Sequence, residues 1–213
     1  MWLFWDLISF FKHGGFFMYP VLLVLTVGIA IIVDRLMFLK KASIDGNALW
    51  KSVEENIRAG RLEDAIQQCK GSEASLPKVL IAGLEKAKHA KPTKDDRDEL
   101  ENHIEEALLI IMPQLESRTH YLPTLANVST LFGLLGTITG LIHAFQSIAS
   151  SDPSQKATML AQGVSEAMNA TAFGIIAAIP LMLFHVYIQS RTVKIVDMLD
   201  AFSIKLINIL TSE

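Results

Sequence analysis

The chain has 213 residues, of which 51% are hydrophobic and only 19% are charged, and its net charge is −3 at neutral pH. A soluble domain usually carries about 25% charged residues, so this composition favours a membrane protein. The near-neutral charge gives no basic surface that would bind nucleic acid. A single cysteine, Cys69, excludes a disulfide framework and a multi-cysteine metal site.

Three long stretches of the sequence are almost free of charge. The first begins at Gly14, the second at Thr119 and the third at Ala157, and within the third the only charged residue is Glu166. About 20 apolar residues in a helix cross the hydrocarbon core of a bilayer. The second and third stretches exceed that length, so we expect them to extend beyond the membrane. The sequence thus predicts membrane-spanning helices at 14–39, 119–150 and 157–190.

The first stretch could also be a secretory signal peptide. Its leading residues, Met1 to Asp6, carry no positive charge, and no small-residue cleavage site follows the apolar run. Asp34 and Arg35 end the run instead. We therefore expect a retained membrane helix.

Lysine and arginine near the ends of the spans predict the orientation of the chain. Arg35, Arg118 and Arg191 flank the spans on one side, whereas the other side has few positive residues. The side with more positive charge faces the cytoplasm. We expect the segment 1–13 and the loop 151–156 on the periplasmic side, and the block 40–118 and the tail 191–213 in the cytoplasm.

The block 40–118 has the pattern of several helices and no strand. Gly60 and Gly71 are typical helix ends, and Ser75 is a typical helix start. Further along, apolar residues recur at helical spacing, which predicts a long helix that runs into the second span and bends near Pro113 or Pro123. The apolar residues of this helix are Leu100, Ile104, Leu108, Ile111 and Leu115, and those of a similar stripe in the tail are Ile195, Leu199, Phe202, Leu206 and Ile209.

Glu166 is the residue that most needs an explanation. It lies about 14 Å from the outer end of the third span if that span is helical. An acidic side chain at the centre of a membrane helix costs about 2.5–3.5 kcal/mol, so it usually faces a bundle interior or a wet cavity. Because a low dielectric favours the neutral form of a carboxyl group, such a residue can exchange protons. The alternative is an interfacial glutamate among lipid headgroups.

Polar residues accompany Glu166 on the third span. Gln162, Asn169 and Phe173 share its helical face, and Thr171 lies near the edge of that face. Helix-to-helix hydrogen bonding would also account for Asn169 and Thr171. Beside an intramembrane glutamate, however, they favour a proton path. Further on, Pro180 would kink the span.

The second span carries three glycines on one face, at positions 133, 136 and 140. Gly133, Gly136 and Gly140 predict close packing of this helix against another. Thr130 and Thr137 lie seven residues apart, so they share a face that could line a channel. A phosphate-binding loop would need a strand and a βαβ unit, and neither is predicted here.

Other chemistries lack their required residues. His120, His143 and His185 have no metal-ligand spacing, so we expect no metal site. Ser165 lacks the flanking glycines of a serine nucleophile elbow. The sequence therefore predicts neither an enzyme nor a bound cofactor.

Two strings in the spans resemble the MotA/TolQ/ExbB proton-channel family, and most closely its ExbB/TolQ branch. The first runs from Leu131 to Thr137 and reads LFGLLGT. The second runs from Gly163 to Gly174, reads GVSEAMNATAFG, and is followed by AIP ending at Pro180. The chain departs from the family pattern at Thr130, where a proline is common, at Asn169, which is often aliphatic, and at Val186, which is often asparagine. These departures leave the subbranch open.

The resemblance implies an all-α polytopic membrane protein that assembles as a pentamer around a central pore. It implies two copies of a single-span ExbD/TolR-like partner with a transmembrane aspartate, and protons rather than a cofactor as the transported species. By motif position, Glu166 matches the intramembrane glutamate of the branch, and Thr137 and Thr171 match its pore threonines. Thr130 and Asn169 are further candidates for the proton path.

Several functions remain open at this level. The resemblance implies a motor subunit in the inner membrane, driven by the proton motive force, that acts through a TonB-like, TolA-like or gliding-motility effector. Sodium in place of protons is not excluded. A non-conducting membrane scaffold is the main alternative, because the helix bundle alone would suit it, but a scaffold would not need Glu166 and the threonines. A membrane-embedded enzyme is the weakest alternative.

Overall fold

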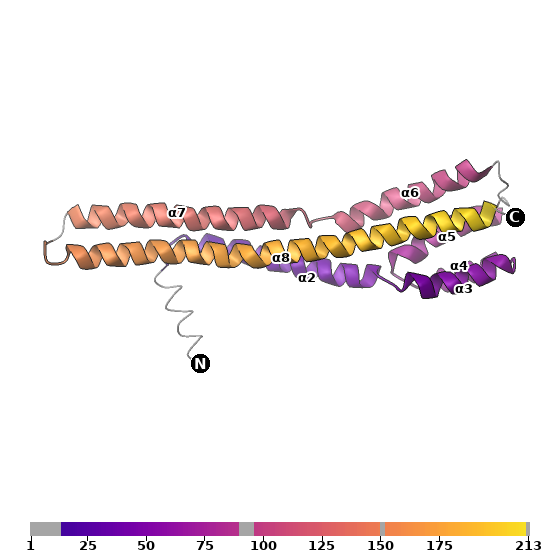
Figure 1. The fold of residues 1–213 in the computed structure, drawn as a ribbon, viewed down its shortest axis with the longest axis horizontal. Coiled ribbons are helices and arrows are strands. Elements are labelled where there is room, and N and C mark those ends of the chain that lie inside the picture. The colour runs from indigo at the N-terminus through magenta and orange to yellow at the C-terminus, as the bar shows by residue number, and fades with distance from the viewer. Residues whose placement is uncertain (1–13, 90–95, 150–151, 212–213) are drawn as a thin grey trace, which may run out of the picture. The chain divides into compact units, whose positions relative to one another are not determined.

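The computed structural model describes residues 14–89, 96–149 and 152–211, and these residues form helices joined by short connections, with no strand among them (Figure 1). The expected segment 1–13 lies outside the described residues. In chain order the helices are α2 (Met18–Ala42), α3 (Gly46–Arg58), α4 (Leu62–Cys69), α5 (Ser75–His89), α6 (Arg97–Glu116), α7 (Tyr121–Ala149) and α8 (Lys156–Thr211).

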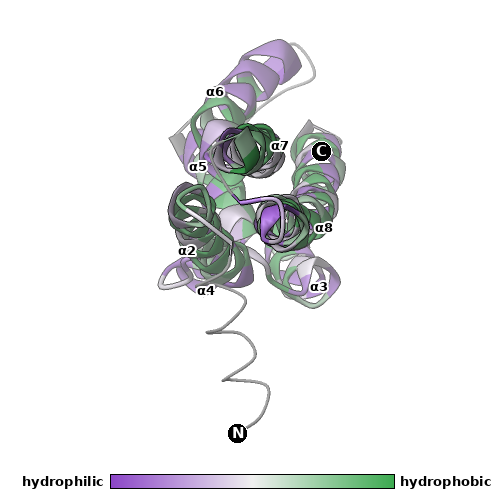
Figure 2. Ribbon diagram, turned by 90° about the vertical axis from the view of Figure 1, so that its left-hand side faces the viewer, coloured by the Kyte–Doolittle hydropathy of each residue, from purple (hydrophilic) through white to green (hydrophobic). Residues whose placement is uncertain are grey.

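The described residues divide into two compact units. Residues 14–33 and 118–187 form the first, which we call the membrane unit, and residues 34–117 and 188–211 form the second, the polar unit. Three helical stretches, which include α2, α7 and α8, are long and apolar enough to cross a membrane. Figure 2 shows the hydrophobic character of α2 and α7 and the hydrophilic character of part of α6. The expected all-α fold with three membrane-spanning helices is thus confirmed.

The helix ends depart from the expected ones in two places. The first span begins at Met18 because Gly15, just before it, has a left-handed backbone with φ of 73°. The third span and the tail form a single helix, with Pro180 inside it. A proline removes one backbone donor, and the rest of the long helix continues on both sides of it.

The connection between α6 and α7 differs from the expected bend at a proline. Pro113 lies inside α6, and Pro123 lies in the first turn of α7, where its missing N–H group would have no partner in the helix. The chain instead leaves the helical path at Ser117 and Arg118, and Arg118 has φ of 62°. The prediction of a bend at Pro113 or Pro123 is therefore wrong, and the break lies between them.

The polar unit begins with three short helices whose ends follow local signals. The side chain of Asp45 accepts hydrogen bonds from the backbone N–H groups of Asn47 and Ala48 and so caps α3. Gly60 and Gly71 have φ of 70° and 90°, and they separate α3, α4 and α5. These are conformations that glycine adopts without steric cost, so the two positions end helices as the sequence predicts.

The core of the polar unit is built from α3, α5, α6 and the end of α8. Gly83 lets α5 approach closely, because a methyl group there would lie 2.6 Å from Leu206 and 3.0 Å from Ile104. Trp50 and Phe202 stack with ring centroids 5.6 Å apart. Most of both predicted apolar stripes is buried, and each fully buried leucine or isoleucine contributes about 1.5–3 kcal/mol. The buried members are Leu100, Ile104, Ile111, Leu115, Ile195, Leu199, Phe202 and Leu206.

Arg35 fastens the last turns of α2 to the end of α6 within the polar unit. Its side chain is buried, and its guanidinium donates hydrogen bonds to the carbonyl oxygens of Leu115 (2.6 Å) and Gln114 (3.0 Å) and to the hydroxyl of Ser117 (3.0 Å). It also lies 4.6 Å from the centre of the Phe38 ring. The last carbonyls of a helix have no partner inside the helix, and a cation is favourable there. Arg35 thus provides the C-terminal cap of α6.

Replacing Arg35 by alanine should therefore destabilise the polar unit by about 2–4 kcal/mol, because it empties a buried site and leaves carbonyl acceptors without a donor. Thermal unfolding of the detergent-purified protein would measure the loss. Arg58→Ala is the matched control, since the Arg58–Glu54 pair lies on the surface, where an ion pair contributes about 0–1 kcal/mol. Equal melting temperatures for the two variants would contradict this account of Arg35.

Candidate functional site

The site is organised by the contact between α7 and α8, which lie side by side in the membrane unit (Figure 1). A methyl group on Gly133 would lie 3.1 Å from the carbonyl oxygen of Ala170 and from the Cα of Gly174. A methyl group on Gly140 would lie 2.9 Å from the Cβ of Ala167. The two backbones are therefore as close as small residues allow.

The contacts follow a regular antiparallel register. Gly133 faces Gly174, Gly140 faces Ala167, and Gly163 faces the next small residue of α7, Ala144. The hydroxyl of Ser129 donates a hydrogen bond to the carbonyl oxygen of Gly174 (3.2 Å) at one end of this contact. We call this row of small residues the seam. The register of the two helices along the seam determines which polar side chains lie on each side of the contact.

One flank of the seam carries hydroxyl groups. The hydroxyls of Thr137 and Thr171 contact each other across the two helices. Both also lie within hydrogen-bonding distance of the carbonyl oxygen of Gly133, to which Thr171 donates at 2.9 Å and Thr137 at 3.3 Å. Thr130 lies two turns from Thr137 on the same flank, exposed, and donates to the carbonyl oxygen of Ala126 (3.2 Å).

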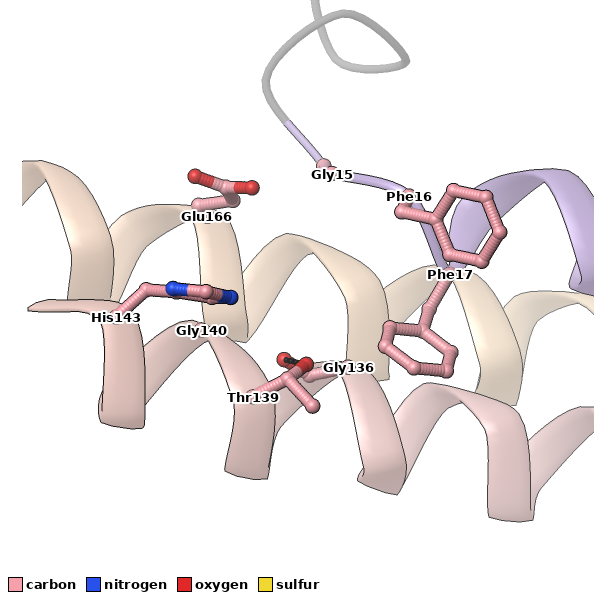
Figure 3. A pocket seen from close by; sticks show the side chains of 9 residues that line it. Gly15, Phe16, Phe17, Gly136, Thr139, Gly140, His143 and Glu166 are labelled. Carbon is pink, nitrogen blue, oxygen red and sulfur yellow. Dashed lines mark hydrogen bonds between the residues drawn. The ribbon is translucent and has the colours of Figure 1, made fainter.

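The other flank carries Glu166. Its side chain lies at a cavity of about 400 Å³ whose walls come from α7, α8 and the residues that lead into α2 (Figure 3). Its other lining residues are Gly14, Gly15, Phe16, Phe17, Gly136, Thr139, Gly140 and His143. We call this the Glu166 cavity. It is an open pocket with a mixed polar and apolar lining, and the side chains of Glu166 and His143 are exposed in the single chain.

The segment before α2 closes one side of the Glu166 cavity. Gly15 lies against the carboxylate of Glu166, and any side chain on Gly15 would overlap it. Its φ of 73° also favours glycine. Phe17 packs next to Gly136, where an added methyl group would lie 3.2 Å from the Cβ of Phe17. The segment that leads into the first span therefore forms one wall of the Glu166 cavity.

The structure divides the predicted proton-path residues between the two flanks. Thr171 follows Glu166 by five residues, which places the two side chains about 140° apart around α8. The side chains of Thr137 and Thr171 touch, Thr130 lies two turns from Thr137, and Glu166 lies across the seam from them. Asn169 follows Glu166 by one turn of α8 but lines a different, shallow surface with Ser165 and Met168.

Two polar residues of the Glu166 cavity were missed by reasoning from the sequence, namely Thr139 and His143. The signal was present, since Gly136, Gly140 and His143 follow one another at i, i+4 and i+7. The same glycines also fit helix packing, and the histidines have no metal-ligand spacing, so neither pattern by itself indicates a cavity. Within the described part of the chain, no three histidine, cysteine or acidic side chains gather as they would at a metal ion.

Replacing Gly133 by alanine should destabilise the membrane unit by about 1–3 kcal/mol, because the new methyl group meets backbone atoms that cannot move aside easily. Ala172→Ser adds one heavy atom to an exposed position of α8, the other helix of the seam, and serves as control. Thermal unfolding in detergent would compare the two. A control that unfolds at as low a temperature as the glycine variant would contradict the close packing of the seam.

The division into flanks can be tested by cross-linking. Paired substitutions Thr137→Cys and Thr171→Cys should form a disulfide within one chain on mild oxidation, because these side chains touch. Thr137→Cys with Glu166→Cys should not. After proteolytic cleavage at a site inserted in residues 152–155, a non-reducing gel would show whether the halves remain joined.

The native cysteine should not interfere with this experiment. Cys69 is buried in the polar unit, and burial raises the pKa of its thiol to about 11, so it stays protonated at neutral pH. A Cys69→Ala background removes it altogether. Efficient cross-linking of the Thr137 and Glu166 pair within one chain would show that both residues lie on the same flank.

Comparison with known proteins agrees with this geometry. The chain is 44% identical to the Tol-Pal system protein TolQ of Haemophilus influenzae over 71 residues, which cover 32% of this chain and 30% of TolQ, less than a third of that protein. It is 27% identical to the putative biopolymer transport protein ExbB-like 3 of Synechocystis over 172 residues, or 80% of this chain and 79% of the relative. A putative ExbB homolog of Methanothermobacter thermautotrophicus is 23% identical over 92% of this chain and 68% of its own length.

A protein-family model also matches this chain. Residues 72–201 match the MotA/TolQ/ExbB proton channel family, a family of membrane channel proteins and not of enzymes. The matched region holds the whole seam, both flanks and most of the polar unit. Since it exceeds half of the chain and the similar proteins are of the ExbB and TolQ types, the chain belongs to the MotA/TolQ/ExbB family, in its ExbB/TolQ branch.

Proposed function

We propose that this chain is the proton-channel subunit of an inner-membrane complex that uses the proton motive force to drive work at the cell envelope. In this proposal, five copies surround two copies of a single-span ExbD/TolR-like partner, which supplies a transmembrane aspartate. The transported species is the proton, and no cofactor takes part. Family membership supports the channel role, and Glu166 with the threonines beside the seam supports proton transport.

The observation that carries the proposal is the Glu166 cavity. Glu166 is the only charged residue from 157 to 190, in a span where a charge costs about 2.5–3.5 kcal/mol. The cavity that the carboxylate borders also carries the imidazole of His143 and the side chain of Thr139. A scaffold could keep the seam and the exposed apolar faces without this carboxylate.

The proposed route enters from the side of the loop 152–155, which connects α7 and α8. Glu166 takes up a proton in the cavity about 15 Å from the start of α8. The proton then passes toward the flank of Thr137 and Thr171, where hydroxyl groups both donate and accept hydrogen bonds. Thr130 would extend this flank, and the partner's aspartate would receive the proton there. One proton crossing 100 mV releases about 2.3 kcal/mol, so sizeable work needs several protons.

Exposed apolar residues next to the seam support assembly in a bilayer. Leu131, Leu134 and Ile138 on α7 are half or more exposed in the single chain. Such faces suit lipid or neighbouring copies. We place the N-terminus in the periplasm and the C-terminus in the cytoplasm, from the positive residues that flank the spans. TonB-type transport, Tol-type envelope maintenance and gliding motility would all use this same arrangement.

The test is proton flux through the complex of this chain with its single-span partner, reconstituted in vesicles. Glu166→Gln keeps the size of the side chain but cannot exchange a proton, so flux should fall at least about tenfold. The matched control is Glu101→Gln, a change at an exposed position of α6 that should leave flux unchanged.

Two outcomes would contradict the proposal. Unchanged flux in Glu166→Gln would remove this residue from the proton path. A complex that assembles with its partner but conducts no protons under an imposed pH gradient and voltage would favour the alternative of a non-conducting scaffold. Size-exclusion chromatography of each variant shows whether the complex assembles.

A further inference from the structure

We propose that His143 is a second proton-exchanging residue of the pathway, which passes protons to Glu166. The inference rests on the proposed function and names a residue to which neither the family motifs nor the sequence pattern gave a role. Glu166 and His143 are the only titratable side chains among the described residues that line the Glu166 cavity. They come from different helices and border the same chamber (Figure 3).

The register of the seam gives the order of the two residues along the membrane. Gly140 faces Ala167, and Ala144 faces Gly163. His143 therefore lies level with the residue after Gly163, whereas Glu166 lies about two residues further from the loop. This difference corresponds to roughly 3 Å along the helix axis. A proton entering from the loop side reaches His143 before Glu166.

The imidazole of His143 is free to act in the cavity. Its ring makes no hydrogen bond to another of the described residues, whereas the neighbouring Thr139 hydroxyl is turned back to the carbonyl oxygens of Leu135 (2.9 Å) and Gly136 (3.2 Å). A histidine that serves only to bind neighbouring helices together would use a ring nitrogen to do so. Among the described residues, neither ring nitrogen of His143 has a hydrogen-bond partner, and the side chain is exposed in the single chain.

The chemistry of imidazole suits a relay. Histidine is the side chain whose charge ordinarily changes between pH 5 and 8, and its ring has one nitrogen that accepts a proton and another that donates one. In the proposed step, one nitrogen takes a proton from a hydronium ion on the loop side, which leaves a water molecule, and the other nitrogen releases a proton to the Glu166 carboxylate. The ring ends neutral and the carboxyl group becomes neutral, so one proton has moved inward.

The described walls of the cavity offer Glu166 no titratable partner other than His143. The described residues from Gly14 to Phe17 carry no titratable side chain, and Gly15 lies directly against the carboxylate. The cavity of about 400 Å³ has room for several water molecules, each of which takes about 30 Å³. The described walls thus leave Glu166 with one titratable neighbour, and that neighbour is His143.

The first test is proton flux of His143→Asn in the reconstituted complex between pH 5 and 8. Asparagine is polar and of similar length but cannot take up a proton. We expect at least about a tenfold loss of flux at pH 7 and a flatter dependence of flux on pH. His120→Asn is the control, because His120 is exposed ahead of the opposite end of α7. Flux and pH profile equal to those of the unmodified complex would overturn the inference.

The second test separates proton transfer from structure. His143→Ala should also lower the proton flux. Added imidazole, which fits the space left by the ring, should raise the remaining flux at least about threefold. Loss of flux without rescue, in a complex that assembles normally, would show that His143 has only a structural role. If Glu166→Gln lowers flux and His143→Asn does not, the proposed function stands and this inference alone fails.

Discussion

The close approach of α7 and α8 is the constraint on which the site depends. Backbone atoms of Gly133 and Gly174 lie so near that a single methyl group has no room between them. Packing of this kind holds membrane helices together where the hydrophobic effect gives no drive between them. It also leaves room on the seam only for small side chains such as those of Ala144 and Ala167, so larger polar side chains lie on one flank or the other. The position of each functional residue around its helix then follows from the register.

The two flanks carry different chemistry. The flank of Thr137 and Thr171 has hydroxyl groups that donate hydrogen bonds to the Gly133 carbonyl oxygen. A hydroxyl group can both donate and accept a hydrogen bond, but it does not become charged near neutral pH. The flank of Glu166 and His143 offers a carboxyl group and an imidazole. Under the proposed function, a proton that leaves Glu166 must cross the seam before it reaches the threonines. A separate acidic group that moves past the helices would complete such a route, which gives the partner's aspartate a physical role beyond anchoring.

Much of the fold was predictable because its causes are local in the sequence. Stretches without charge predicted the three spans, and apolar spacing predicted the buried stripe that contains Leu199. Gly60 and Gly71 were predicted to end helices, and both have positive φ in the structure. The break between α6 and α7 was not predictable from local signals, and it lies where Arg35 donates a hydrogen bond to Ser117 across 82 residues of sequence. The prolines were the visible local signal, and the long-range cap determined where the helix ended.

The site shows the same limit of sequence reasoning. Motif positions located Glu166, Thr137 and Thr171, but a motif records the order of residues and not the side of a helix that meets a neighbour. Only the register shows that α8 turns Glu166 toward Gly140, His143 and the segment that leads into α2, and Thr171 toward Thr137. A carboxyl group in a membrane is most easily kept where it can become neutral. Under the proposed function, the imidazole of His143 supplies the proton that neutralises the Glu166 carboxylate. The residue that carries the proton and the residue that delivers it therefore line the same cavity.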